Sequence, residues 1–176
     1  MRFQLAFLLA LLPTVGFAVG MEDDTPPMPT ETTETCEEGL VWDLETKSCL
    51  TPEETTNDDT AMMRDARELA YQGRYADASS VLDRLDPADP WVLTYRGFLA
   101  RKTGDIDGAM AAYSDALAID ADHLLARSYM GQGMAEQGDL DGARYQLTEI
   151  RKRGGRGTWP EVALRLALET GTGFNY

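Results

Sequence analysis

The sequence has little of what metal sites and most enzyme active sites require. Among 176 residues it contains one histidine, His123, and two cysteines, Cys36 and Cys49. These fall short of the four clustered ligands of a structural zinc site. No set of nucleophile, base and acid emerges along the chain, and His123 ends a turn-like segment, DADH, where we expect it to face solvent. The sequence therefore predicts a protein that is not an enzyme and that has no cofactor or metal.

Basic residues are also scarce, and the imbalance is local. The chain has 16 Lys and Arg against 30 Asp and Glu. Residues 22–59 contain 13 of the acidic residues and a single base, Lys47, whereas residues 60–176 contain 17 acidic and 14 basic residues. An acidic segment of this kind repels phosphates, so we expect no nucleic-acid partner. A basic or weakly charged partner remains compatible with the composition.

Long apolar runs are absent except at the N-terminus. Residues 1–20 begin with a cation at Arg2, continue with about ten mostly apolar residues and end in small residues, which is typical of a secretory signal peptide. A membrane anchor is disfavoured, because crossing the roughly 30 Å hydrocarbon core takes about 20 apolar residues. We expect cleavage after Ala18 or Gly20, and a periplasmic or secreted protein with no stable membrane anchor.

The next segment, residues 21–59, is rich in Asp, Glu, Thr and Pro. It has too few large apolar groups to offset the entropy of ordering, so we expect a flexible acidic linker. An apolar island, CEEGLVWDLETKSC, interrupts it at residues 36–49. In an exported chain Cys36 and Cys49 are expected to form a disulfide that closes a small hairpin, worth about 3 kcal/mol for a loop of this length. Twelve intervening residues argue against thiol redox catalysis, which favours two.

This island resembles the last part of peritrophin-type chitin-binding domains, although the four other cysteines of that family are missing. The matching residues are Cys36, Gly39, Leu40, Trp42, Asp43 and Cys49. The resemblance implies that Trp42 could stack on a sugar or dock a partner. Packing of Trp42 over the disulfide is the alternative.

Three similar segments follow: QGRYADAS at residues 72–79, TGDIDGAM at 103–110 and QGDLDGAR at 137–144. Their glycines lie 31 and 34 residues apart, a period typical of stacked structural repeats. Apolar residues at helical spacing flank each glycine, which predicts a helical hairpin in each copy. We expect the glycine to end the first helix in a left-handed conformation, the acidic residues after it to begin the second helix, and a small alanine to let the two helices approach closely.

The three copies resemble tetratricopeptide repeats. The matching positions are Ala66, Gly73, Ala78 and Leu82 in the first copy, Gly97, Gly104, Ala109, Tyr113 and Ala116 in the second, and Gly131, Gly138, Ala143 and Leu147 in the third. The resemblance implies an all-α solenoid at residues 60–176, with repeats at about 60–89, 90–123 and 124–153. The second helix of the first copy is cut short near Pro87.

A solenoid of hairpins needs a cover at its end, and TWPEVALRLALETG provides one. We expect a capping helix at about residues 159–170, started by a capping box from Thr158 to Glu161 and stopped by Gly171. The preceding cations, in RKRGGRG, either stabilise a helix C-terminus or form a binding patch.

The tetratricopeptide resemblance implies a binding scaffold with a concave groove lined by the first helices. The groove positions are Met63, Arg67, Tyr71, Thr94, Phe98, Arg101, Lys102, Ser128 and Gln132. They favour a protein or peptide with an apolar anchor and a carboxylate, and the acidic tail of the chain itself is one candidate. Met63, Tyr95 and Tyr129 stand where the family's carboxylate clamp has other residues, so ligands of that clamp are not expected.

Two alternatives remain open at this point. Tyr71 and Phe98 could simply pack between repeats while Arg67 and Arg101 pair with nearby acids. The protein could also contact the cell wall or a glycan through the hairpin at residues 36–49, with the repeats serving assembly. Under either hypothesis the biological role falls in the cell envelope.

Overall fold

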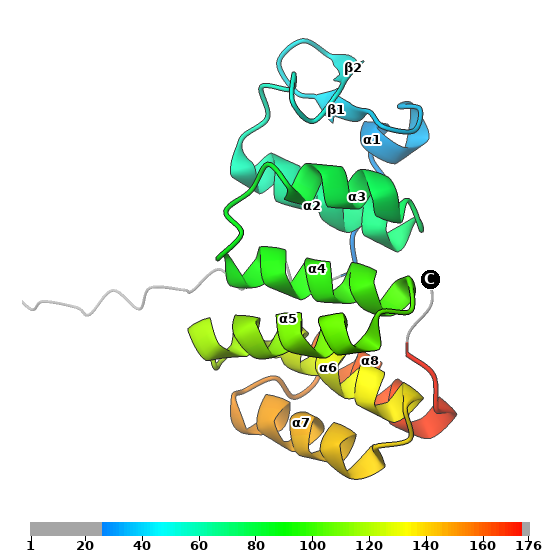
Figure 1. The fold of residues 1–176 in the computed structure, drawn as a ribbon, viewed down its shortest axis with the longest axis vertical. Helices are drawn as coiled ribbons and strands as arrows, with labels where there is room; N and C mark the ends of the chain where they lie inside the picture. The colour runs from blue at the N-terminus through cyan, green and yellow to red at the C-terminus, as the bar shows by residue number, and fades with distance from the viewer. Residues whose placement is uncertain (1–25, 174–176) are drawn as a thin grey trace, which may run out of the picture.

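The computed structural model describes residues 26–173, so the predicted signal peptide at residues 1–20 lies outside the described residues. Helices dominate this range, and the strands form one small antiparallel hairpin (Figure 1). The elements are α1 (Glu31–Glu34), β1 (Val41–Asp43), β2 (Ser48–Leu50), α2 (Asp59–Tyr71), α3 (Tyr75–Leu82), α4 (Pro90–Lys102), α5 (Ile106–Ile119), α6 (Leu124–Glu136), α7 (Leu140–Lys152) and α8 (Trp159–Thr170). Within residues 26–173, no helix has both the length and the apolar character needed to cross a membrane.

The helices from α2 to α7 form three hairpins, α2 with α3, α4 with α5 and α6 with α7, stacked one on the next (Figure 1). The first helices α2, α4 and α6 contact one another in order, and α8 packs on α6 and α7. The predicted all-α hairpin solenoid of three repeats with a C-terminal capping helix is therefore confirmed.

The glycine turns that revealed the repeats do what their spacing predicts. Gly73, Gly104 and Gly138 have φ values of +78°, +93° and +82°, in the left-handed region that favours glycine. In the second and third hairpins an aspartate follows, and its carboxylate accepts a hydrogen bond from a backbone N–H of the next helix at 2.9 Å: Asp105 from Gly108 and Asp139 from Gly142. These acids therefore begin helices, as expected.

In the first hairpin Arg74 stands where the other two copies have aspartate. Its guanidinium pairs with Asp77, with 2.6 Å between Nη2 and Oδ2. It also donates hydrogen bonds to the carbonyl oxygens of Thr32, Cys36 and Glu37. The substitution thus ties the first repeat to the segment that precedes it.

The structure corrects the prediction of a flexible linker at residues 21–59, because residues 26–58 pack on α2. Thr30 donates its N–H and its hydroxyl to the Glu68 carboxylate, at 2.7 and 2.6 Å, and the Thr32 hydroxyl donates to Asp65 at 2.8 Å. Val41 of β1 joins the same hydrophobic core as the first two hairpins. Composition misses this order because the contacts are mostly hydrogen bonds between threonines and two buried carboxylates of α2.

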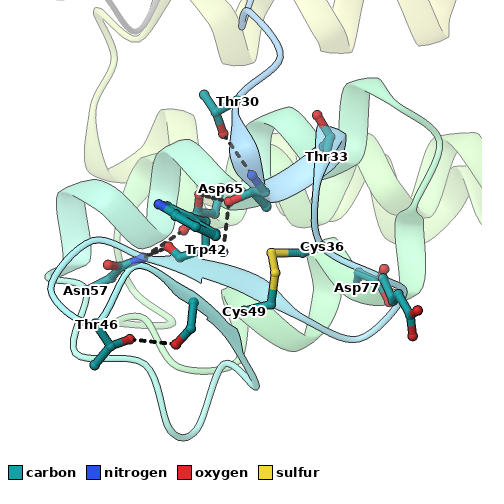
Figure 2. Close-up of a disulfide and its surroundings, with 12 residues drawn as sticks. Thr30, Thr33, Cys36, Trp42, Thr46, Cys49, Asn57, Asp65 and Asp77 are labelled. Atoms are coloured by element: carbon teal, nitrogen blue, oxygen red, sulfur yellow. Dashed lines mark hydrogen bonds between the residues drawn. A yellow bond between two sulfur atoms is a disulfide. The ribbon is translucent and has the colours of Figure 1, made fainter.

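The predicted disulfide between Cys36 and Cys49 is present. It joins the segment after α1 to β2, which pairs antiparallel with β1 (Figure 2). We call residues 30–57, with this bond, the N-terminal cap, since they cover α2 and the start of α3.

Helix α8 lies where the capping helix was predicted, and Thr158 is its N-cap residue. The predicted capping box is wrong, since the Thr158 hydroxyl donates to the Gly155 carbonyl oxygen at 2.7 Å. Glu161 instead pairs with Arg151 at the end of α7, 2.6 Å away. The neighbouring Arg153 pairs with Glu149 and Asp122, so these cations hold helix ends together.

Candidate partner-binding groove

The nine groove residues predicted from the sequence all belong to the adjoining helices α2, α4 and α6. They differ in accessibility. The half-buried residues are Met63, Tyr71 and Lys102, and the buried ones are Arg67, Thr94, Phe98, Arg101, Ser128 and Gln132. The part of this face open to a partner is therefore smaller than the sequence suggested.

The centre of the face is a set of aromatic rings that we call the aromatic ladder: Tyr71, Tyr95, Phe98, Tyr113 and Tyr129. The Phe98 ring lies 5.8 Å from that of Tyr71, 5.1 Å from that of Tyr129 and 6.2 Å from that of Tyr95, measured between centroids. The Tyr71 and Tyr129 hydroxyls are 2.5 Å apart. Ring contacts at these distances stabilise beyond the area they bury, so the ladder joins the first helices of all three repeats.

Three cations of the predicted groove sit on this ladder. Arg67 donates from Nε to the Tyr95 hydroxyl at 3.1 Å, and Arg101 pairs with Glu136 at 2.8 Å. The guanidinium carbon of Arg101 and the ammonium nitrogen of Lys102 lie 5.7 and 5.4 Å from the centroid of the Phe98 ring. Both alternatives for these residues thus contribute: the rings pack between repeats, and Arg101 has an acidic partner.

Burial decides how these groups titrate. It raises the pKa of Tyr113 to about 12, so that hydroxyl stays protonated at neutral pH. Burial lowers the pKa of Lys102, and the positive charge of Arg101 adds to the effect. For Arg101 burial alone would lower the pKa, but Tyr113 and Glu136 more than offset it. The face therefore presents a fixed guanidinium next to a more easily discharged ammonium.

A pocket of about 460 Å³ opens at the C-terminal ends of α2 and α4. It contains three of the predicted residues, Tyr71, Phe98 and Lys102, and its wall also includes Pro27 from the segment before the N-terminal cap. The lining residues are Pro27, Ala70, Tyr71, Gln72, Gly73, Tyr75, Phe98 and Lys102. Aromatic walls with one cation at the rim suit an apolar side chain near a carboxylate or another hydrogen-bond acceptor.

The predicted positions on α6 are covered rather than open, because α8 packs on that helix. The Ser128 hydroxyl donates to the carbonyl oxygen of Pro160 in α8 at 2.7 Å, and Gln132 donates to the Ser128 hydroxyl at 3.1 Å. Thr94 is likewise buried, with its hydroxyl donated to Pro90 of its own helix. Ser128 and Thr94 thus serve packing in this structure.

At the opposite ends of α2 and α4, Met63 lines a smaller pocket of about 190 Å³. Trp91 and three acids, Asp59, Asp86 and Asp89, lie around it. The Asp89 carboxylate caps α4 by accepting from the Trp91 N–H at 2.7 Å. This end of the face is acidic, in contrast to the Lys102 end.

The structure also corrects the expectation that His123 faces solvent. His123 is buried, and its ring packs against Trp91 with 4.4 Å between centroids. The turn between α5 and α6 folds onto the start of α4, which the turn sequence alone does not reveal. Burial lowers the pKa of His123, so the neutral form is favoured. Within the described part of the chain, no group of three or more His, Cys, Asp or Glu is placed to hold a metal ion.

Trp42, the residue of the glycan hypothesis, is half-buried in the N-terminal cap. Its N–H donates to the Thr32 hydroxyl at 3.1 Å, and its carbonyl oxygen accepts from Asn57 at 2.9 Å. Its side chain lines a pocket of about 220 Å³ together with Leu44, Arg64 and Asp65 (Figure 2). Trp42 therefore packs toward α2 and keeps part of its ring accessible.

Sequence reasoning missed several residues of the groove. Tyr95 and Tyr129 were noted only as departures from a clamp, yet they lie 34 residues apart, one repeat, and this spacing could have identified a repeating aromatic position. Tyr75 begins the second helix of the first hairpin and had no such signal. Pro27 could not be found, because it reaches the pocket only through the packing of the N-terminal cap.

Compared with known proteins, the chain matches no protein-family model, no curated protein and no solved structure. The tetratricopeptide and chitin-binding resemblances thus stand on the residues quoted for them.

Proposed function

We propose that this chain is an exported, non-enzymatic scaffold of the tetratricopeptide type that binds a protein or peptide partner in cell-envelope assembly or maintenance. The observation that carries the proposal is the pocket of about 460 Å³ between α2 and α4. Its aromatic walls, Tyr71 and Phe98, would take an apolar anchor, and Lys102 would take an acceptor beside it.

The N-terminal cap supports the exported location in this proposal. Its disulfide belongs to the kind of bond that persists in oxidising compartments and is rare in reducing ones. A periplasmic or secreted protein, released by cleavage after Ala18 or Gly20, is consistent with this chemistry.

The second hypothesis, a contact to the wall or to a glycan through residues 36–49, has one favourable observation, the partly accessible ring of Trp42. It is weaker because most polar groups of the cap are engaged with α2. Deleting residues 21–59 cannot separate the hypotheses, since the deletion would uncover α2.

The experiment compares point variants in cross-linking pulldowns from envelope extract. Tyr71→Ala combined with Lys102→Glu alters the pocket, Trp42→Ala alters the cap, and Tyr145→Ala removes an exposed aromatic ring of α7 as the matched control. We expect the pocket variant to lose the partner at least tenfold, while the other two retain it and all keep the helical circular-dichroism signal. Loss with Trp42→Ala alone would favour the glycan or wall hypothesis instead.

A further inference from the structure

The chain returns to the groove after α8. Gly171 ends α8 in the left-handed region, with φ of +73°, and two residues later Gly173 is buried between α4 and α6. The Gly173 N–H donates to Oε1 of Glu136 at 2.8 Å. A Cβ atom at position 173 would lie 2.4 Å from Nη1 of Arg101 and 2.3 Å from Oε1 of Glu136. Only glycine fits there, so the backbone itself enters the groove at this point.

The residue that receives this backbone, Arg101, has hydrogen-bonding capacity left over. Its Nη1 pairs with Glu136, but its buried Nε and Nη2 have no hydrogen-bond partner among the described residues. Buried guanidinium donors are normally satisfied, because an unmade hydrogen bond there costs free energy. An acceptor is therefore expected close to Gly173.

Arg101 also connects Gly173 to the aromatic pocket. Its guanidinium carbon lies 5.7 Å from the centroid of the Phe98 ring, and Phe98 lines the pocket with Tyr71 and Lys102. The three residues that follow Gly173 in the sequence are Phe174, Asn175 and Tyr176. Three residues reach at most about 10 Å, enough to carry a side chain from Gly173 to that ring and too little to pass far beyond it.

We propose that residues 174–176 of this chain occupy the aromatic pocket in the free protein, and that a partner must displace them. An aromatic side chain of the segment packs against Tyr71 and Phe98, and the Asn175 amide oxygen or a backbone carbonyl accepts from Arg101. Displacement rests on the proposed function, whereas occupancy of the pocket does not. The partner that competes is then a segment with an aromatic anchor and an acceptor for Arg101.

The first test uses the peptide GTGFNY, residues 171–176, with a fluorescent label on its amino end and an amidated carboxyl end. Its binding is measured by fluorescence anisotropy to the full chain and to a chain that stops after Gly173. A tethered segment acts at an effective concentration near the millimolar range, so we expect the shortened chain to bind the peptide at least about tenfold more tightly than the full chain. The control peptide GTGANA and the shortened chain with Tyr71→Ala should show no binding. Equal affinity for both chains, or none for either, overturns the proposal.

A second test needs no truncation and decides the matter if the shortened chain fails to fold. Tyr176→benzoylphenylalanine in the full chain is illuminated, and cross-linked tryptic peptides are identified by mass spectrometry. We expect intrachain links to the ends of α2 or α4, around Tyr71 and Phe98. Links elsewhere overturn the proposal, and links that yield a dimer show that a second copy is the occupant. If these tests succeed while the pulldown of the pocket variant shows no loss, the segment occupies the pocket and the proposed function is wrong.

Discussion

Asp43 shows how a single carboxylate organises the loop of the N-terminal cap. Its two oxygens accept six hydrogen bonds, from the backbone of Glu45 and from backbone and hydroxyl groups of Thr46, Thr55 and Thr56. The backbone hydrogen bonds from Thr46 and Thr56 hold its pKa well below the usual range. Because an unfolded aspartate titrates at about 3.9, this group stabilises the fold above that pH and loses its contribution as the pH falls further.

Asp65 acts in the opposite direction. Burial raises its pKa to about 6, against hydrogen bonds from Thr32 and Asn57 that lower it. Its contribution to stability is therefore present below about pH 4 and is lost as the pH rises through about 6. Two carboxyl groups of one module thus shape its pH dependence in separate windows.

The residue-scale prediction is that Asp43→Asn lowers the melting temperature at pH 7 and flattens its decline in acid. An amide offers one acceptor oxygen, so its NH2 group would face donors that the carboxylate satisfied. Thermal melts of the two proteins between pH 2 and 7 measure this. Asp141→Asn is the control, since the Asp141 side chain is 97% exposed and its pairing with Arg144 is correspondingly weak. An unchanged acid limb in the Asp43 variant would contradict the assignment.

At the scale of elements, the hairpins could be predicted and the N-terminal cap could not. The hairpins follow from local rules, namely a left-handed glycine, an aspartate N-cap and a small residue at each crossing. Gly97 illustrates the last rule, because a Cβ atom there would lie 2.5 Å from the Tyr113 ring. The cap depends on Thr30 and Thr32 reaching Glu68 and Asp65 over more than 30 residues of sequence, and composition gives no sign of such pairs.

The element-scale prediction concerns the disulfide. Cys36→Ser with Cys49→Ser removes a constraint worth about 3 kcal/mol on the unfolded chain, so we expect the cap to open locally. Hydrogen exchange followed by mass spectrometry should show lost protection at residues 30–57 and in the first turns of α2. The second hairpin, α4 with α5, should keep its protection. Equal loss in α4 and α5 would mean that the cap and the repeats unfold together.

At the scale of the molecule, the two ends of the solenoid are covered by different devices. The N-terminal cap closes α2 through hydrogen bonds and a disulfide, and α8 closes α6 through apolar packing. The sequence predicted α8, but not that α8 would remove Ser128 from the open face or that the chain after it would return to Arg101. Those outcomes depend on where the terminal helix lies across α6, which no local pattern specifies.

Replacing Leu164 tests the C-terminal cover. Leu164 is fully buried and packs against the glycine at position 131, where a Cβ atom would lie 2.7 Å from its Cδ2. Leu164→Ala leaves a cavity that α6 cannot fill, so we expect a loss of about 2–5 kcal/mol in urea unfolding. In a stack of hairpins each unit contacts only its neighbours, so hydrogen exchange should rise most in α6 and α8 and least in the N-terminal cap. Arg165→Ala, on the exposed side of the same helix, is the matched control and should change stability by less than about 0.5 kcal/mol. Exchange that rises equally in α2 would show that the three hairpins unfold as one cooperative unit.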